Sequence, residues 1–305
     1  MIFHILGGGS LGQLWASRLA LAGFDCRLIL RDPPALTEWN SAGAQITLRQ
    51  PDRCDTVAVP GQLATQPEPI DNLIVATKAY AVVDALTGLA ARMKPNSTAL
   101  LLQNGLGSQQ AAHALLSGQR VLYASVTDGA WRDGTNTVVW AGKGQTRLGD
   151  PDHGDHPIWL APLRASGIAC SWENDILPVL WEKLAINCSI NPLTAIHDCR
   201  NGAIPQRAGP RLALVVAELQ TLLVQAQMPH IAARLPETVD EVICRTADNS
   251  SSMRQDVKAG RRTEIEFILG YACRAATASG CNVPQLQALY AELRALLASR
   301  GLPVD

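Results

Sequence analysis

The feature that most constrains the fold is a glycine-rich turn near the start of the chain. The turn, Gly7-Gly8-Gly9-Ser10-Leu11-Gly12, follows an apolar run at Ile2 to Leu6 and opens a stretch with helical spacing, Leu11 to Ala22. A G-x-G-x-x-G pattern between a strand and a helix is typical of units that bind the pyrophosphate of a dinucleotide. The first glycine permits the tight turn, the second lets the backbone approach the pyrophosphate, and the third lets helix and strand pack. The alternative is a turn without a ligand.

Short apolar runs continue through the first 170 residues and alternate with helix-like segments. The runs are Cys26 to Leu30, Leu73 to Thr77 and Ala99 to Gln103. Such alternation predicts parallel strands buried on both faces. Between Val121 and Leu148, turn residues separate β-prone stretches, which predicts antiparallel hairpins at the edge of this sheet.

The pattern changes after about Trp172, where β-branched runs give way to helical spacing. We expect an α/β domain over residues 1–170 and an all-α domain over residues 171–305. The predicted helices are Leu177 to Ile190, Gly209 to Gln227, Pro236 to Thr246, Ser250 to Lys258, Thr263 to Ser279 and Pro284 to Ala298.

Composition excludes several classes of function. The net charge is −1, so nothing indicates nucleic-acid binding, and the sequence contains no apolar run long enough for a membrane span. Eight cysteines occur without a C-x-x-C pair or a secretion signal, which favours reduced thiols in a cytoplasmic protein. The Asp- and His-containing segment from Gly149 to Pro157 reads as a solvated turn, and we expect no metal site.

Polar residues that follow the predicted strands indicate which cofactor is bound. Arg31 stands where NAD enzymes carry an acidic residue for the ribose hydroxyls, and a guanidinium matches a 2′-phosphate, so NADP(H) is favoured. The neighbouring Asp32 keeps NAD open. Lys78 and Asn104 also follow strands, at the edge where open α/β sheets bind ligands.

A polar stripe marks the first helix of the second domain. Lys183, Asn187 and Asn191 are spaced i, i+4, i+8 among apolar residues, so they share one helix face. Burying an ammonium and two amides without partners costs roughly several kcal/mol. The stripe therefore favours a pocket in which a small oxyacid is the partner. The alternative is an internal polar network. Pro192 is expected to end or kink this helix.

A second polar cluster lies further along the helical domain. Asn249 and Ser252 share one face at a predicted helix start, where free N–H groups favour a carboxylate. The alternative is capping by Asn249 or Ser250, which can coexist with that role. Thr263 and Glu266 fit a T-x-x-E capping box, which leaves Glu264 without a capping role.

Six blocks of sequence together resemble the ketopantoate reductase (2-dehydropantoate 2-reductase) family. They are the glycine turn, Thr77-Lys78-Ala79, Asn104-Gly105-Leu106-Gly107, the run from Lys183 to Ala195, and the segments 249–256 and 262–265. The resemblance implies a Rossmann domain followed by a helical domain of the 6-phosphogluconate dehydrogenase C-terminal type, with substrate in a cleft between them. It also implies NADPH-dependent reduction of ketopantoate to (R)-pantoate, a step of pantothenate biosynthesis in the coenzyme A pathway.

The resemblance also implies roles for individual residues. Gly7 to Gly12 and Arg31 would hold the pyrophosphate and 2′-phosphate of NADP(H). Lys78, Asn104 and Ala130 would line the nicotinamide end, and Glu264 would lie near the nicotinamide ribose and Lys183. Lys183 would donate the proton. Positions that match substrate-binding residues are Asn187, Asn191, Asn201 and Ser252, with Asn249 beside them.

Some features leave the function open. Gln103, Tyr80 and Asp128 depart from residues common in close relatives, which puts the breadth of substrate choice in doubt. A reductase of another 2-oxoacid or of an imine would use the same scaffold, and a non-catalytic NADP(H)-binding regulator is a third hypothesis. The expected partner is a small 2-oxoacid, and the chain is expected to be a monomer or homodimer.

Overall fold

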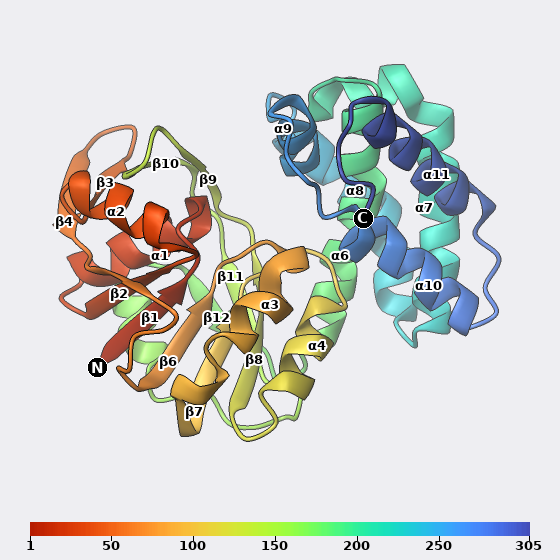
Figure 1. Cartoon of the computed structure of the whole chain (residues 1–305). Helices are drawn as coiled ribbons and strands as arrows, with labels where there is room; N and C mark the ends of the chain where they lie inside the picture. Colours follow the sequence, from red (N-terminus) through yellow and green to blue (C-terminus); the bar gives the residue numbers. More distant parts are fainter. The chain divides into compact units, whose positions relative to one another are not determined.

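The computed structural model describes all 305 residues, and contacts divide the chain into two compact units (Figure 1). The first unit comprises Met1–Gln103 and Ser108–Leu177, and the second comprises Asn104–Gly107 and Pro178–Asp305. The short segment Asn104–Gly107 therefore belongs by its contacts to the second unit, although its neighbours in sequence belong to the first.

The first unit is built on an eight-stranded sheet with the order β12-β11-β8-β7-β6-β1-β2-β5. All neighbouring strands are parallel except β8 and β11. Strand order reverses at β1, which pairs with β2 on one side and with β6 on the other. Its strands are β1 (Ile2–Leu6), β2 (Asp25–Leu30), β5 (Gly61–Leu63), β6 (Ile70–Val75), β7 (Met93–Leu101), β8 (Arg120–Val126), β11 (Thr146–Gly149) and β12 (Cys170–Trp172).

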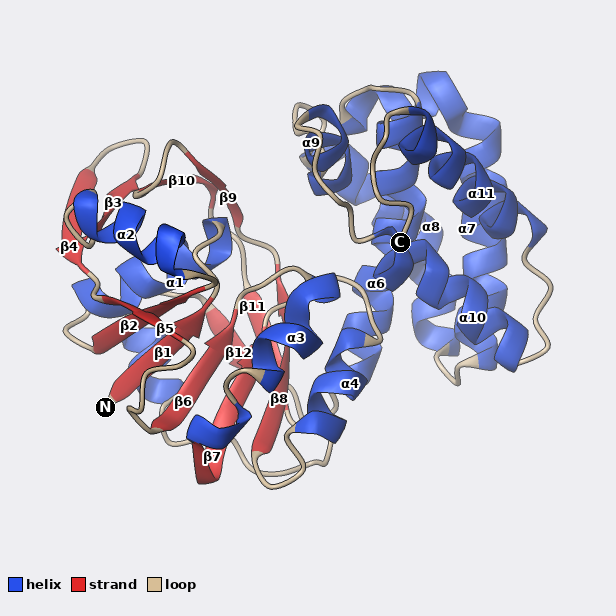
Figure 2. Cartoon of the chain, viewed as in Figure 1, coloured by secondary structure: helices blue, strands red, loops and turns tan.

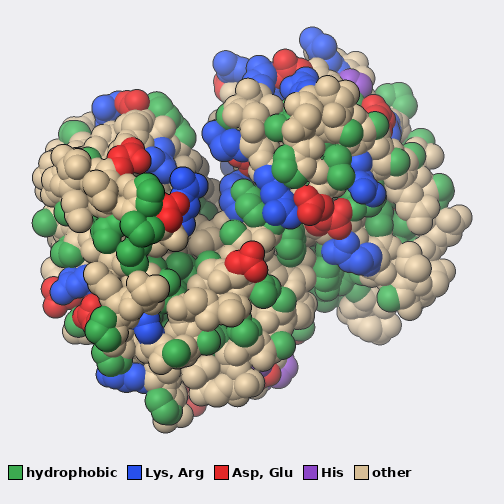
Figure 3. Space-filling view, viewed as in Figure 1, with side chains coloured by type: hydrophobic (Ala, Val, Ile, Leu, Met, Phe, Trp, Pro, Cys, Tyr) green, Lys and Arg blue, Asp and Glu red, His purple; other side chains and the backbone are tan.

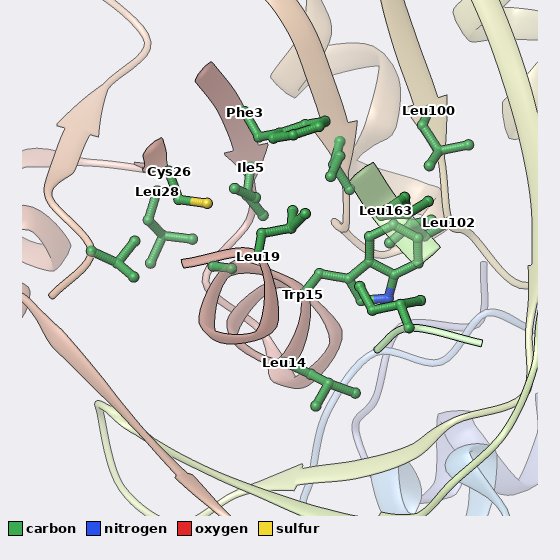
Figure 4. Close-up of a cluster of buried hydrophobic side chains, with 14 of the residues drawn as sticks. Phe3, Ile5, Leu14, Trp15, Leu19, Cys26, Leu28, Leu100, Leu102 and Leu163 are labelled. Carbon is green, nitrogen blue, oxygen red and sulfur yellow. The ribbon is translucent and has the colours of Figure 1, made fainter. Parts of the chain in front are cut away.

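Apolar side chains from the central strands and the first helix form the core of this unit (Figure 4). Phe3 and Ile5 on β1, Leu28 on β2, and Trp15 and Leu19 on α1 are almost fully buried. The central parallel strands carry runs of buried apolar residues at Leu28–Leu30, Leu73–Val75 and Ala99–Leu101, as expected for strands buried on both faces. The sheet predicted from the short apolar runs is confirmed.

Helices accompany the strands of the first unit (Figure 2). Helix α1 contacts β1 and β2 of the main sheet and also the strands of a second, smaller sheet. The unit contains α1 (Ser10–Leu21), α2 (Pro33–Ser41), α3 (Val82–Thr87), α4 (Ser108–Leu115), α5 (Leu160–Ala165) and the 3-10 turns η1 (Ala79–Ala81) and η2 (Ala90–Arg92).

The antiparallel hairpins expected at the edge of the main sheet are only partly observed. Strands β8 and β11 pair antiparallel next to the edge strand β12. The hairpin of β9 (Gly129–Arg132) and β10 (Thr137–Gly142) is antiparallel, but it does not extend the main sheet. It joins β3 (Gln45–Arg49) and β4 (Cys54–Ala58) in a separate four-stranded sheet, where β10 pairs with β3 in parallel. The pairing of β10 with β3 joins segments far apart in sequence, and no local pattern signals it.

The second unit is helical (Figure 2). Pro192 was expected to end or kink α6, but the helix continues through it to Ile196, so the proline does not end the helix. Helix α7 contains a non-helical residue at Ala208, before Pro210. The elements are α6 (Leu177–Ile196), η3 (Asn201–Ala203), α7 (Ile204–Gln225), α8 (Pro229–Arg245), α9 (Ser252–Lys258), the π-helical segment η4 (Glu266–Gly270), α10 (Tyr271–Ala278) and α11 (Pro284–Ser299).

The predicted capping box at Thr263 and Glu266 was also wrong. The Thr263 hydroxyl is buried without a hydrogen-bond partner. Glu266 instead accepts a hydrogen bond of 2.8 Å from Arg274 and another from the Tyr290 hydroxyl. The glutamate is therefore used to tie η4 to α10 and α11.

The surface and the helices add two observations. Basic and acidic side chains occur side by side on the face of each unit shown in Figure 3, as expected for a net charge of −1. None of the helices combines the length and the apolar character that crossing a bilayer requires.

Candidate active site

The glycine turn lies at the point where strand order reverses. Gly7 has φ +111°, which favours glycine, and a Cβ on Gly12 would overlap the Gly7 carbonyl, so α1 begins in close contact with the end of β1. A Cβ on Gly9 would meet nothing within 4 Å. The α1 N-terminus has no side-chain cap and no acidic residue in its first turn. Open space in front of free N–H groups suits an anionic group such as a pyrophosphate.

A buried hydroxyl without a hydrogen-bond partner lies next to this turn. The Oγ1 atom of Thr77, just beyond β6, is buried without a hydrogen-bond partner. A Cβ on Gly7 would lie 3.1 Å from the Thr77 backbone nitrogen, so the hydroxyl-bearing residue adjoins the glycine turn. A buried polar atom without a partner is uncommon in folded proteins. The chain around Gly7 and Thr77 therefore fits a polar ligand such as a dinucleotide.

Arg31 follows the end of β2, as expected, and its side chain is 87% exposed. It contacts Asp32 through an ion pair of 2.8 Å. Asp32 is the N-cap of α2 and accepts a 2.8 Å hydrogen bond from the Ala35 nitrogen. The carboxylate that kept NAD open is thus engaged in starting a helix, whereas the guanidinium extends into solvent.

Lys78 and Ala130 lie on different elements of the first unit. Lys78 is partly exposed and directly precedes η1. Ala130 lies on β9, partly exposed and packed against the core cluster.

Lys183 and Glu264 both lie in the second unit, on α6 and just before η4. Glu264 is 5% exposed, and Lys183 is partly exposed. Removal from water lowers the pKa of Lys183 to about 8, and the charge of Glu264 opposes this shift. A pKa near 8 lets the amine change its protonation state close to neutral pH, which suits a proton donor.

The asparagines proposed to bind substrate differ in their surroundings. Asn187 and Asn191 lie on α6 with Lys183, and Asn191 is 8% exposed. Asn201 is buried, its Nδ2 donates a 2.8 Å hydrogen bond to the Thr246 hydroxyl, and its Oδ1 has no partner. That oxygen is an acceptor left over for a ligand hydroxyl.

The cluster around α9 requires a correction. Ser251, and neither Asn249 nor Ser250, caps the helix, and its hydroxyl accepts a 3.1 Å hydrogen bond from the Arg254 nitrogen. Asn249 and Ser252 are exposed. The Ser251 hydroxyl also contacts that of Thr194 at 2.6 Å, which ties α9 to α6.

Three residues near the glycine turn were missed by sequence reasoning. Gln13 and Arg132 each donate a 3.2 Å hydrogen bond to the Gly8 carbonyl. Gln103 is buried and donates to the carbonyls of Val75 and Thr77, at 2.8 and 3.1 Å. Gln103 had been noted only as a departure from relatives, and no local signal links Arg132 to a turn so far away in sequence.

The loop from Gly149 to Pro157 is held in place by an ion pair and a hydrogen bond to the rest of the first unit. Arg120 lies 2.7 Å from the buried Asp150, and His153 contacts the Asn174 carbonyl at 3.1 Å. No group of three His, Cys, Asp or Glu side chains is arranged to hold a metal ion.

An α/β unit with a glycine turn where strand order reverses, followed by a helical unit with a low-pKa lysine, defines a class of dinucleotide-dependent oxidoreductases. Family models give the particular family: residues 3–153 match "Ketopantoate reductase PanE/ApbA" and residues 175–297 match "Ketopantoate reductase PanE/ApbA C terminal". The chain belongs to the ketopantoate reductase family.

Individual relatives agree with this assignment. The chain is 34% identical over 296 residues to the 2-dehydropantoate 2-reductase of Vibrio cholerae, covering 96% of each chain. It is 34% identical over 293 residues to that of Shigella flexneri, covering 95% of this chain and 93% of the other.

Solved structures show the same fold. A PanE/ApbA family ketopantoate reductase from Ralstonia eutropha has a TM-score of 0.88 at 24% identity, covering 99% of this chain and 100% of the other. D-mandelate dehydrogenase with NADH and anilino(oxo)acetate has a TM-score of 0.86 at 21% identity, with the same coverage. At these sequence identities, the two structures show that the fold is shared and nothing further.

Proposed function

We propose that this chain catalyses the NADPH-dependent reduction of 2-dehydropantoate (ketopantoate) to (R)-pantoate, a step of pantothenate biosynthesis. The curated relatives with this activity match the chain almost from end to end. The observation that carries the chemistry is the Lys183 amine, whose pKa lies near 8 in the same unit as Glu264. A small 2-oxoacid is the partner.

The binding roles follow the fit of the residues. Gly7–Gly12 and Arg31 are proposed to bind the pyrophosphate and 2′-phosphate of NADP(H). Lys78, Asn104, Ala130 and Glu264 are proposed to surround its nicotinamide ribose end. The amides of Asn187, Asn191 and Asn201 are proposed to hold the carboxylate and hydroxyl of the ketoacid, together with Asn249 and Ser252.

The residues of the chain then manage charge and protons. NADPH, when bound, supplies the hydride for the ketone carbon. The Lys183 ammonium stabilises the negative charge that grows on the ketone oxygen, and it delivers the proton that completes the alcohol. Glu264 favours the charged form of Lys183, so the amine regains a proton from solvent for the next turnover.

Lys183→Ala is the experiment that tests this function. We expect turnover of ketopantoate, followed by NADPH absorbance, to fall by about 10²- to 10⁴-fold, the typical contribution of general acid catalysis. The dissociation constant of NADPH should change little, because the amine is assigned to the ketone. Near-normal turnover in the variant would remove Lys183 from the mechanism.

A reductase of another 2-oxoacid is the second candidate, because D-mandelate dehydrogenase shares the fold. A panel of 2-oxoacids should distinguish them, and it should include phenylglyoxylate, the ketoacid that corresponds to mandelate. We expect the highest kcat/KM with ketopantoate. A higher value with another ketoacid would reassign the substrate.

A further inference from the structure

The segment Asn104–Gly107 makes its contacts with the second unit, whereas the residues before and after it in sequence belong to the first unit. The backbone nitrogen of Leu106 donates a 2.8 Å hydrogen bond to the carbonyl of Phe267, in the π-helical segment η4. The Phe267 carbonyl thus accepts a hydrogen bond from outside its own helix. π-helical turns are rare and occur often at functional sites.

Gly105 makes this contact possible. Its φ is +77°, and a Cβ would lie 2.6 Å from the Phe267 carbonyl carbon and closer still to the oxygen. The colliding atoms are backbone, so no side-chain rotation would relieve the overlap. Gly107, with φ +106°, faces the Tyr271 ring, where a Cβ would lie 3.3 Å from Cδ2.

Residues in and next to η4 also contact Glu264 and the helix that carries Lys183. The backbone nitrogen of Phe267 donates a 3.1 Å hydrogen bond to the carbonyl of Glu264. The ring of Tyr271 packs edge-on against Trp181, at 5.8 Å between centroids, and Trp181 precedes Lys183 on α6. The segment that follows Asn104 is thus linked through Phe267 to the Glu264 backbone, and Tyr271 contacts the helix that carries Lys183.

We propose that Gly105 is a positioning residue, which through the Leu106–Phe267 hydrogen bond fixes Asn104 relative to Glu264 and Lys183. This inference rests on the proposed function, because it takes Asn104 as a residue that binds the nicotinamide ribose end of NADP(H). The spacing of these three residues is then set by η4. Any side chain at position 105 displaces Asn104 and weakens binding of that end of the cofactor.

Gly105→Ala tests the proposal, with Gly280→Ala as the matched control. Gly280 has φ +68° in the same unit, and a Cβ there would meet nothing within 4 Å, so it carries the backbone strain without the collision. Titration calorimetry would measure two probes, NADPH and adenosine 2′,5′-bisphosphate, which lacks the nicotinamide end. No ketoacid is present, so the result does not depend on the substrate.

In Gly105→Ala we expect NADPH to bind at least tenfold more weakly and the bisphosphate to bind within twofold of wild type. Gly280→Ala should leave both affinities unchanged. If Gly105→Ala does not fold, Gly107→Ala should show a smaller loss that is again confined to NADPH. Unchanged NADPH affinity in the folded variant, or equal losses for both probes, would overturn the proposal. A wild-type chain that binds NADPH without reducing ketopantoate would refute the proposed function alone.

Discussion

The proposed chemistry depends on how firmly the Lys183 amine holds its proton. Loss of water around the amine lowers its pKa to about 8, while Glu264 raises it. Because the ammonium is the proposed proton donor, kcat/KM for ketone reduction should fall as pH rises through about 8. The same shift makes the free energy of unfolding rise above that pH, because the unfolded chain still binds the proton that the folded chain has released.

Glu264→Gln tests the cause of this pKa. The amide keeps the size of the carboxyl group but removes the charge that raises the pKa of Lys183. The fall in kcat/KM should therefore begin at lower pH than in the wild type. A pH–rate profile of both proteins provides the measurement, and superimposable profiles would mean that Glu264 does not act on Lys183.

A second residue, Arg31, is expected to decide between the two nicotinamide cofactors. Its guanidinium is exposed beside a carboxylate that caps α2, so it is available to a 2′-phosphate. Arg31→Ala should weaken NADPH binding by about tenfold or more, since hydrogen bonds to charged groups contribute roughly 1.5–3 kcal/mol. NADH binding should be nearly unchanged. Equal losses for both cofactors, measured as dissociation constants, would contradict the assignment.

Among the elements, α9 shows how a short helix depends on one hydroxyl. Ser251 caps this helix and contacts Thr194 of α6. Ser251→Ala should lower the free energy of unfolding by about 1–2 kcal/mol, because it removes a cap and leaves a buried hydroxyl with one partner fewer. Denaturant unfolding measures the loss, and Thr238→Ala, on the exposed face of α8, is a control expected to change little.

Whether an element could be predicted from the sequence depended on whether local forces decide it. The apolar runs at β1 and β2 and the glycine turn were predictable, since burial and backbone freedom act within a few residues. The end of α6 was not, because the helix continues through the buried Pro192, where the local rule predicts an end or a kink. The T-x-x-E pattern failed for a similar reason, since Glu266 has stronger partners in Arg274 and Tyr290.

The candidate site divides along the same line. Lys183 and Asn191 could be proposed from the sequence because polar groups on an apolar helix stand out locally. Arg132 was not found, because its contact with Gly8 joins residues far apart in sequence. The pairing of β10 with β3 brings distant segments together in the same way. Roles of single residues came from the family resemblance rather than from spacing.

For the whole molecule, cofactor binding should appear as stability. A ligand that binds only the folded chain raises the free energy of unfolding by about 2.7 kcal/mol at 100 times its dissociation constant. Calorimetry should therefore show a melting temperature that rises with NADPH concentration and rises less with equal NADH. A melting temperature independent of NADPH would contradict the proposed cofactor.

The assignment of Asn104–Gly107 to the second unit has a consequence for anyone who recombines these proteins. A chimera that takes residues 178–305 from a relative would place the host's Gly105 against a foreign π-turn. The exchange should include residues 104–107 as well, so that donor loop and donor turn remain a matched pair. A single crossover point after the last strand does not separate this chain into transplantable halves.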